Sequence, residues 1–171
     1  FIIEREMPGA GTLTQAASTR SFTFPQGTVV KRGGYVVLAR SSSRAAFEAF
    51  WGVTLGADVV FLTSTDHQAT EVPTINGSET YTLTDPFGAV RDGPTIAMAS
   101  SARQSVARLP GGAAGSPSSW TVASDASGTP GAGVDPASRG HGVFISEFSD
   151  AGGTGAFVHE FVELHFDGRP D

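Results

Sequence analysis

The chain has no cysteine among its 171 residues, which excludes disulfide bonds, thiolate metal ligands and a cysteine nucleophile. It has a single lysine, Lys31, beside ten arginines, a bias typical of GC-rich bacterial genomes. The formal net charge is -6 and the only basic pair is Lys31-Arg32, so binding to nucleic acid or to an anionic membrane surface is disfavoured. Because no apolar run is long enough to cross a bilayer, we expect no membrane insertion.

Turn-forming residues, in contrast, are abundant. The 22 glycines and 10 prolines predict many short elements joined by tight turns rather than long helices. The length fits one domain, 1–171, and a domain of this size buries roughly two-thirds of the surface of its unfolded chain. It therefore needs neither a metal nor a disulfide bond to be stable.

Short strand-like segments recur along the whole chain. They are apolar throughout or alternate between apolar and polar residues, as strands do when they bury both faces or one face. Segment 35–39 is apolar throughout, and the two strongest segments, 142–148 and 157–166, lie close to the end of the chain. The other segments are 1–3, 21–24, 28–30, 59–62, 80–84, 104–109 and 120–122.

One short helix is expected between the serines at 41–43 and Gly52. The serines are favourable N-cap residues, and glycine is the usual residue just after a helix. Phe47, Phe50 and Trp51 follow the i, i+3, i+4 spacing, so they form one apolar face. We interpret this segment as a helix that covers one end of a sheet, with an aromatic ligand site as the alternative.

Two further stretches predict how the strands connect. Asn76-Gly77 is the strongest hairpin signal in the chain, and residues 85–88 form a second turn signal. Residues 123–141 are small, polar and rich in glycine and proline, and we interpret them as a linker. The whole pattern predicts an all-β fold, a β-sandwich with one short helix.

Several segments, taken together, are similar to one known family. Residues 143–148 (VFISEF) and Glu160 to Leu164 (EFVEL) resemble the first two strands of the lamin tail domain. Residues 24–39 resemble its central hairpin, and Thr129 to Ala132 (TPGA) resembles its end. The resemblance implies an immunoglobulin-like β-sandwich, a structural role for Glu163 in the sheet, and a module of exported bacterial surface proteins.

The order of these segments differs from that of the family, in which the strands found here at 142–166 come first. The chain is either circularly permuted or cut from a tandem array, in which 142–171 would open the next copy. A linker of nineteen residues can span roughly 60 Å. We therefore expect 142–166 to complete the sheet of its own chain, pairing beside residues 1–5. The alternative is exchange of that segment between two chains, which would give a dimer.

The histidines and acids offer a few candidate metal ligands. His159, Phe161, Glu163 and His165 share one face of the predicted last strand by its period of two, which makes Glu163 and His165 weak candidates for metal ligands. Asp150, in a glycine-rich loop, is a weak candidate for a calcium ligand, together with Asp167 and Asp171 after the last strand. The alternatives are a hydrogen-bonded strand face and ordinary turn chemistry, and no cofactor is expected.

No catalytic arrangement is predicted. Ser64, Asp66 and His67 contain the residue types of a hydrolase triad, but neighbours in one loop do not provide the required geometry. An isopeptide bond would need a buried lysine, and Lys31 lies at a turn, with Asn76 the only asparagine. The chain is therefore expected not to be an enzyme.

Three functions remain compatible with these observations. The first is an extracellular or cell-surface interaction or adhesion module of a secreted multidomain bacterial protein, binding a protein or a glycan. The second is a structural spacer, and the third is an accessory domain that positions a neighbouring secreted hydrolase. A fold does not by itself identify a ligand. An exposed aromatic or acidic patch would favour the first function.

Overall fold

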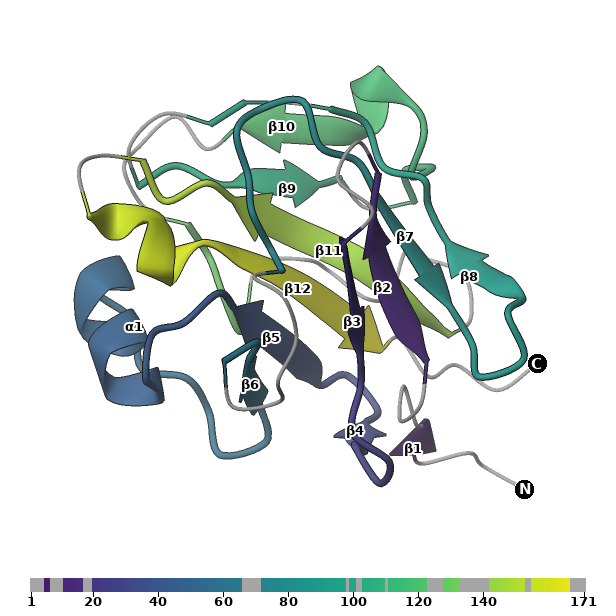
Figure 1. Ribbon diagram of the computed structural model, residues 1–171, viewed down its shortest axis with the longest axis horizontal. Helices are drawn as coiled ribbons and strands as arrows, with labels where there is room; N and C mark the ends of the chain where they lie inside the picture. The colour runs from purple at the N-terminus through teal and green to yellow at the C-terminus, as the bar shows by residue number, and fades with distance from the viewer. Residues whose placement is uncertain are drawn as a thin grey trace.

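The computed structural model describes residues 5–6, 11–16, 20–65, 72–97, 99–100, 103–109, 111–122, 128–132, 142–152 and 155–166. Two β-sheets lie face to face, with a single short helix at one end (Figure 1). The predicted all-β sandwich with one short helix is confirmed. In the described part of the chain, no helix is long and apolar enough to span a membrane.

The larger sheet has six strands in the spatial order β10-β9-β11-β12-β5-β6. Neighbouring strands are antiparallel except β5 and β6, which run parallel. In chain order these strands are β5 (Tyr35–Ala39), β6 (Val60–Thr63), β9 (Val106–Arg108), β10 (Trp120–Val122), β11 (Val143–Ser149) and β12 (Phe161–Phe166).

The smaller sheet has four antiparallel strands in the order β3-β2-β7-β8. A separate two-residue pairing joins β1 to β4. Their bounds are β1 (Arg5–Glu6), β2 (Thr12–Gln15), β3 (Arg20–Thr23), β4 (Val30–Lys31), β7 (Tyr81–Thr84) and β8 (Val90–Asp92). The helical elements are α1 (Arg44–Trp51) and the short 3-10 helices η1 (Pro117–Ser119) and η3 (Ala156–His159).

The main core lies between the two sheets because every strand points alternate side chains inward. Each large apolar side chain removed from water there contributes about 1.5–3 kcal/mol before the entropy of ordering is subtracted. Its buried members include Leu13, Phe22, Tyr81, Leu83, Val36, Leu38, Ile145, Phe148, Val162 and Leu164.

The expected helix is confirmed as α1, but it packs on the outer face of the six-stranded sheet and does not cap the end of the sandwich. The side chain of Ser43 accepts a hydrogen bond from the Ala46 N–H at the start, and Gly52 ends the helix with a φ of 66°. Phe47 and Trp51 pack edge-on against Phe161 of β12. They form a second apolar cluster with residues that include Val37, Ala39, Leu55, Val59 and Ala151.

Strands β11 and β12 lie in the middle of the larger sheet and pair with strands of the same chain. β11 pairs with β9, and β12 pairs with β5 along Phe161 to His165. The expectation that they pair beside residues 1–5 is wrong, because β1 pairs with β4. The physical reason is that β11 and β12 pair with each other and use their other edges to pair with β9 and β5, of which β5 offers five residues, four of them buried. Residues 1–4 lie outside the described residues.

The Asn76-Gly77 hairpin prediction is also wrong. These residues lie in the connection between β6 and β7, which belong to different sheets, so no hairpin can form around them. The hairpin that does form joins β7 to β8 through residues 85–89. Part of the predicted linker 123–141 is also packed against the protein, because Gly128 and Pro130 are buried.

Candidate interaction site

Three of the five candidate metal ligands lie in the described residues, and these three do not form a metal centre. Glu163 and His165 share one face of β12, as predicted, and neither has any exposed surface. Asp150 follows β11 and accepts a hydrogen bond from the Ser100 hydroxyl at 3.2 Å. No group of three or more histidine, cysteine, aspartate or glutamate side chains that could hold a metal is found in the part of the chain that the structure describes.

The other sequence candidates are also dispersed. His159 lies in η3 and not on β12, so it does not continue the strand face, and its ring stacks on Phe50 at 4.3 Å. The Ser64 hydroxyl donates a hydrogen bond to the Arg40 carbonyl. Lys31 is exposed and paired with Asp58, which is not the buried environment of an isopeptide bond. Residues 66, 67, 141, 167 and 171 lie outside the described residues.

Two glutamates that face each other across β11 and β12 form a buried acid pair, Glu147 and Glu163. They occupy directly opposite positions in the register, with exposures of 1% and 0%. Glu163 accepts hydrogen bonds from the Ser146 hydroxyl (2.7 Å) and the Gly131 N–H (2.5 Å). Glu147 accepts them from the Thr129 N–H (2.8 Å) and hydroxyl (2.9 Å). All these donors are uncharged.

The electrostatics of the acid pair favour a bound proton. Burial is the main cause that raises the pKa of Glu163 well above its ordinary value, and the charge of Glu147 raises it further. Burial also raises the pKa of Glu147, although the hydrogen bonds from Thr129 act in the opposite direction. The two carboxyl groups titrate as a coupled pair. Both are sealed from solvent, so we assign the pair to the architecture of the protein rather than to a reaction.

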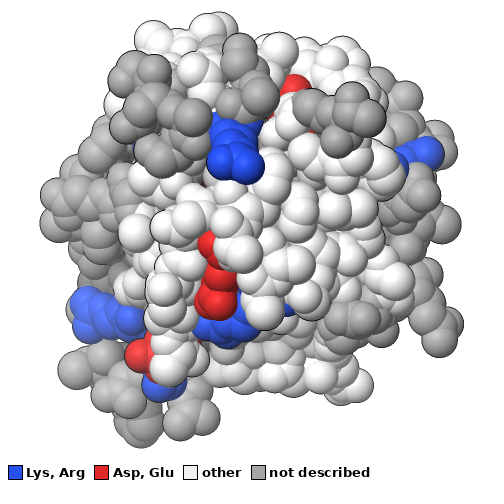
Figure 2. Space-filling view, turned by 90° about the vertical axis from the view of Figure 1, so that its left-hand side faces the viewer, with Lys and Arg blue, Asp and Glu red and all other residues white. Residues whose placement is uncertain are grey.

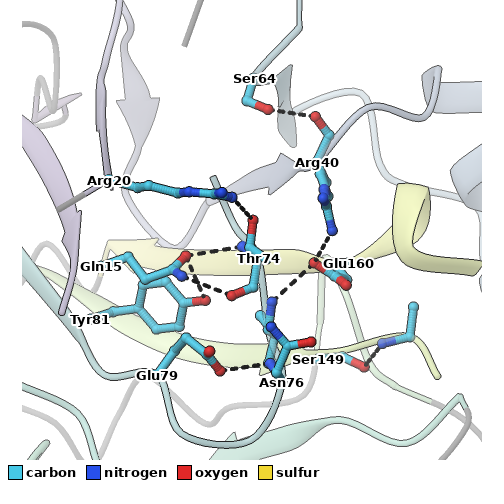
Figure 3. A network of polar contacts seen from close by, with 12 residues as sticks. Gln15, Arg20, Arg40, Ser64, Thr74, Asn76, Glu79, Tyr81, Ser149 and Glu160 are labelled. Atoms are coloured by element: carbon cyan, nitrogen blue, oxygen red, sulfur yellow. Dashed lines mark hydrogen bonds and ion pairs between the residues drawn. The ribbon is translucent and has the colours of Figure 1, made fainter. Parts of the chain in front are cut away.

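A second polar cluster lies between the sheets and is drawn in Figure 3. The side-chain amide of Gln15 on β2 donates to the Thr74 carbonyl at 2.8 Å and accepts from the Thr74 N–H at 2.9 Å. Glu160, just before β12, accepts from the Ile75 N–H at 3.0 Å and pairs with Arg40 at 3.2 Å. We call Gln15, Arg20, Arg40, Thr74, Tyr81 and Glu160 the inter-sheet network; Arg20 donates to Thr74, and Tyr81 to Gln15.

The inter-sheet network fixes the connection between β6 and β7 to both sheets. Within it, burial raises the pKa of Glu160 to about 7, and the Ile75 N–H and the Arg40 charge reduce this rise without cancelling it. The Arg40 guanidinium also stacks over the Phe157 ring at 4.9 Å. The hydrogen bonds and the ion pair described for this network hold the two sheets and the β6–β7 connection together.

Among the described residues, the most exposed large apolar side chain is at the tip of the β7–β8 hairpin. Phe87 is 94% exposed, and Val90, the first residue of β8, is 61% exposed. The tip lies at the end of the sandwich away from α1 and η3 (Figure 1). An aromatic ring held in water at a loop tip is unfavourable for the free protein, and it is the kind of side chain that dominates binding interfaces.

Asp85 holds the hairpin tip in one conformation. One oxygen of its carboxylate accepts hydrogen bonds from the N–H groups of Phe87 and Ala89, each at 2.9 Å. Its other oxygen pairs with Arg91 at 3.0 Å. Burial alone would raise the pKa of Asp85, but these hydrogen bonds and the Arg91 charge outweigh it, so the pKa is lowered. The tip is therefore built as a rigid turn with an ionised aspartate at its centre.

The base of the hairpin is tied to the opposite sheet. Asp92, at the end of β8, accepts hydrogen bonds from Arg108 (2.6 Å) and from the Ile145 N–H (2.9 Å). Arg108 is buried and lies over the rings of Trp120 and Phe144 at 5.5 Å each. The Asp92–Arg108 pair connects β8 to β9 and β11, so the hairpin projects from a fixed base.

The opposite end of the molecule offers a different surface. Figure 2 shows this end, where uncharged atoms predominate and blue and red atoms are sparse. Phe157 in η3 is 49% exposed there, but Arg40 covers one face of its ring. The two tryptophans are each only 5% exposed. Phe87 is thus the described aromatic side chain that is most available to a partner.

Comparison of the chain with protein-family models, with curated proteins and with solved structures finds no significant match. The described architecture defines an all-β sandwich. The resemblance to the lamin tail domain, with the permuted or tandem order, stays a prediction.

The sequence predicted the turn at 85–88, but the acid pair and the exposed Phe87 at that turn were missed. The signal for the pair was available, because two strong neighbouring strands each carry a glutamate near the middle. The signal for the tip was the sequence DPFG, in which Phe87 occupies a turn position that cannot be buried between sheets.

Proposed function

We propose that the protein is a non-enzymatic interaction module of a secreted or cell-surface bacterial protein, and that it binds a protein partner through the β7–β8 hairpin tip. The observation that carries the proposal is the 94% exposure of Phe87 on a turn held by Asp85. A rigid turn loses little conformational entropy on binding, so an apolar anchor placed on it is efficient.

The chemistry of the tip favours a protein partner over a glycan. Phenylalanine has no polar group to pair with sugar hydroxyls, whereas tyrosine and tryptophan do. The two tryptophans are buried. The tip combines Phe87 and Val90 with Arg91, which is 55% exposed, so an apolar anchor stands beside a polar rim. The partner should therefore present an apolar pocket with a polar edge.

The proposal is tested by placing a photo-crosslinking phenylalanine analogue at position 87 and, as a matched control, at position 157. Both sites carry an exposed phenylalanine, but they lie at opposite ends of the sandwich. The probe is the envelope and secreted protein fraction of the cells that produce the chain. We expect one protein to be crosslinked from position 87 and not from position 157.

Binding of the purified, crosslinked protein is then measured by calorimetry with two variants. We expect Phe87→Ala to weaken binding at least tenfold, a loss of about 1.4 kcal/mol or more, because a buried aromatic anchor is lost. Phe157→Ala should leave the affinity unchanged. Equal binding by both variants would contradict the proposal, because the partner would then be bound by another surface.

A further inference from the structure

Residues 128–132 cross over the acid pair and are held to it by three hydrogen bonds. Thr129 donates its N–H and its hydroxyl to Glu147, and Gly131 donates its N–H to Glu163. Both carboxyl groups belong to the central strands β11 and β12. The segment is therefore anchored to both buried acids.

The same segment closes the apolar cluster beneath α1. A Cβ at Gly128 would lie 2.9 Å from the Trp51 ring, so the backbone rests directly on the indole. At Gly131, with a φ of +83°, a Cβ would lie 2.8 Å from a methyl group of Leu55. Pro130 between them is buried. Release of the segment would therefore open Trp51 and Leu55 to water.

No described arginine or lysine is ion-paired with the acid pair. The described ion pairs join Lys31 to Asp58, Arg40 to Glu160, Arg44 to Glu48, Arg91 to Asp85 and Arg108 to Asp92. Two adjacent buried carboxylates without a cation repel each other strongly, because water is not there to screen them.

The surroundings of the acid pair contain few titratable groups. The titratable group on the outer face of β12 is His165. The titratable group on β5 is Tyr35, whose ring lies 4.5 Å from that of His165. On β9, Ala107 is opposite Glu147, and Arg108 turns to Asp92. The crossing segment, described over 128–132, and the neighbouring side chains of the α1 cluster contribute uncharged groups.

We propose that residues 128–132 form a strap that stays docked while Glu147 and Glu163 together carry at most one negative charge, and that detaches when both ionise. When the two carboxyl groups share one proton, the protonated group can donate a hydrogen bond to the other. The pair then carries a single negative charge, which the N–H and hydroxyl groups of the strap can stabilise. A second charge adds repulsion that three hydrogen bonds from uncharged donors do not offset. The device releases the strap on the alkaline side and uncovers the Trp51 surface.

The proposal is tested by fluorine NMR on protein labelled with 5-fluorotryptophan. The chain contains only two tryptophans, Trp51 under the strap and Trp120 on β10, so two resonances report local and global change separately. As the pH rises from about 6 to about 10, we expect the Trp51 resonance to move to a solvent-exposed position. The Trp120 resonance should stay in place until global unfolding.

Glu163→Gln and Glu147→Gln are the informative variants, because glutamine resembles a protonated glutamate and cannot ionise. Each should abolish the Trp51 transition or raise its midpoint by at least about one pH unit. Two substitutions protect the test against one that fails to fold. Glu79→Gln, at a buried acid in the connection before β7, is the matched control and should leave the midpoint unchanged.

Three results would overturn the proposal. The Trp51 resonance could stay in place up to about pH 10 in the folded protein, or it could move together with that of Trp120. It could also move in both glutamine variants at the same pH as in the wild type. A fourth result, from adding a chelator and then calcium, would also contradict the proposal. If chelator opens the strap at neutral pH and about 1 mM calcium restores it, the pair holds a metal and not a proton. This test is independent of the hairpin tip and of its partner.

Discussion

The acid pair and the inter-sheet network bury glutamates only three residues apart in sequence, Glu160 and Glu163, yet the two carboxyl groups are treated differently. Glu160 has a cationic partner, Arg40, at 3.2 Å, and one backbone N–H. Glu163 has only uncharged donors and a second acid, Glu147, opposite to it. The first arrangement can hold a charge at neutral pH, and the second favours a proton.

The difference between Glu160 and Glu163 shows that burial and the charge of the neighbouring groups act separately on the pKa of a carboxyl group. Burial is the largest cause of a raised pKa in both places. For Glu160 the Ile75 N–H and the Arg40 charge limit the rise of the pKa to about 7, whereas for Glu163 the neighbouring Glu147 raises the pKa further. Glu160 and Glu163 therefore lie close together in the chain but differ in whether their neighbours oppose or add to the effect of burial on the pKa.

The largest expected effect is a pH-dependent loss of stability that Glu160→Gln removes. The pKa of Glu160 rises from 4.5 to about 7 on folding, so the folded state keeps a proton that the unfolded state releases. Its stabilising contribution is complete below about pH 4.5 and is lost as the pH rises to about 7. Between about pH 5 and pH 8 the wild type should lose on the order of 2 kcal/mol that the variant keeps.

Urea denaturation at several pH values measures this difference. Only the slope with pH is compared, because the substitution also leaves Arg40 without its carboxylate. Glu163→Gln serves as the contrasting variant, since it removes a buried acid whose described hydrogen-bond donors are all uncharged. Parallel stability curves for wild type and Glu160→Gln would show that Glu160 does not titrate in this range.

A smaller effect is expected from Arg40→Met, and it should grow with pH. At about pH 8 the ionised form of Glu160 is favoured by only one pKa unit, or about 1.4 kcal/mol, because the group can take up a proton when Arg40 is lost. We therefore expect the pH-dependent part of the destabilisation to be about 1 kcal/mol at pH 8 and to vanish near pH 5.

The same denaturation series tests this variant. A pH-independent part, from the lost contact with Phe157, is expected at both pH values. Arg91→Met, at an ion pair whose arginine is 55% exposed, is the control and should cost less than about 1 kcal/mol throughout. If Arg40→Met is equally destabilising at both pH values, the charge of Arg40 does not act on Glu160.

The architecture could be predicted from the sequence because it follows from local patterns. The apolar run at 35–39 became β5, the alternating segment 80–84 contains β7, and the serine and glycine that flank 44–51 became the caps of α1. These signals need only the neighbouring residues to be interpreted. The class of fold and the helix were therefore accessible without coordinates.

The pairing of strands was less accessible because it depends on residues far apart in the chain. Asn76-Gly77 has the residues of a hairpin turn, but Gln15 binds the backbone of Thr74 and holds the connection between sheets. Likewise, the acid pair requires the register of β11 against β12, which includes a shift between Ile145 and Glu147. A one-residue change of register would move Glu147 to the other face.

The smallest expected effect comes from Glu79, whose pKa is lowered in the folded protein, whereas that of Glu160 is raised. Burial would raise its pKa, but the N–H groups of Asn76 and Ser78 among other hydrogen bonds outweigh it, so the pKa is lowered. Its contribution is therefore present above about pH 4.5 and is lost as the pH falls through the folded-state pKa. Glu79→Gln should cost about 1 kcal/mol at pH 7 and nearly nothing in acid, measured by urea denaturation. If the loss of stability instead grew in acid, the protonated form of Glu79, like that of Glu160, would be the one that the folded state favours.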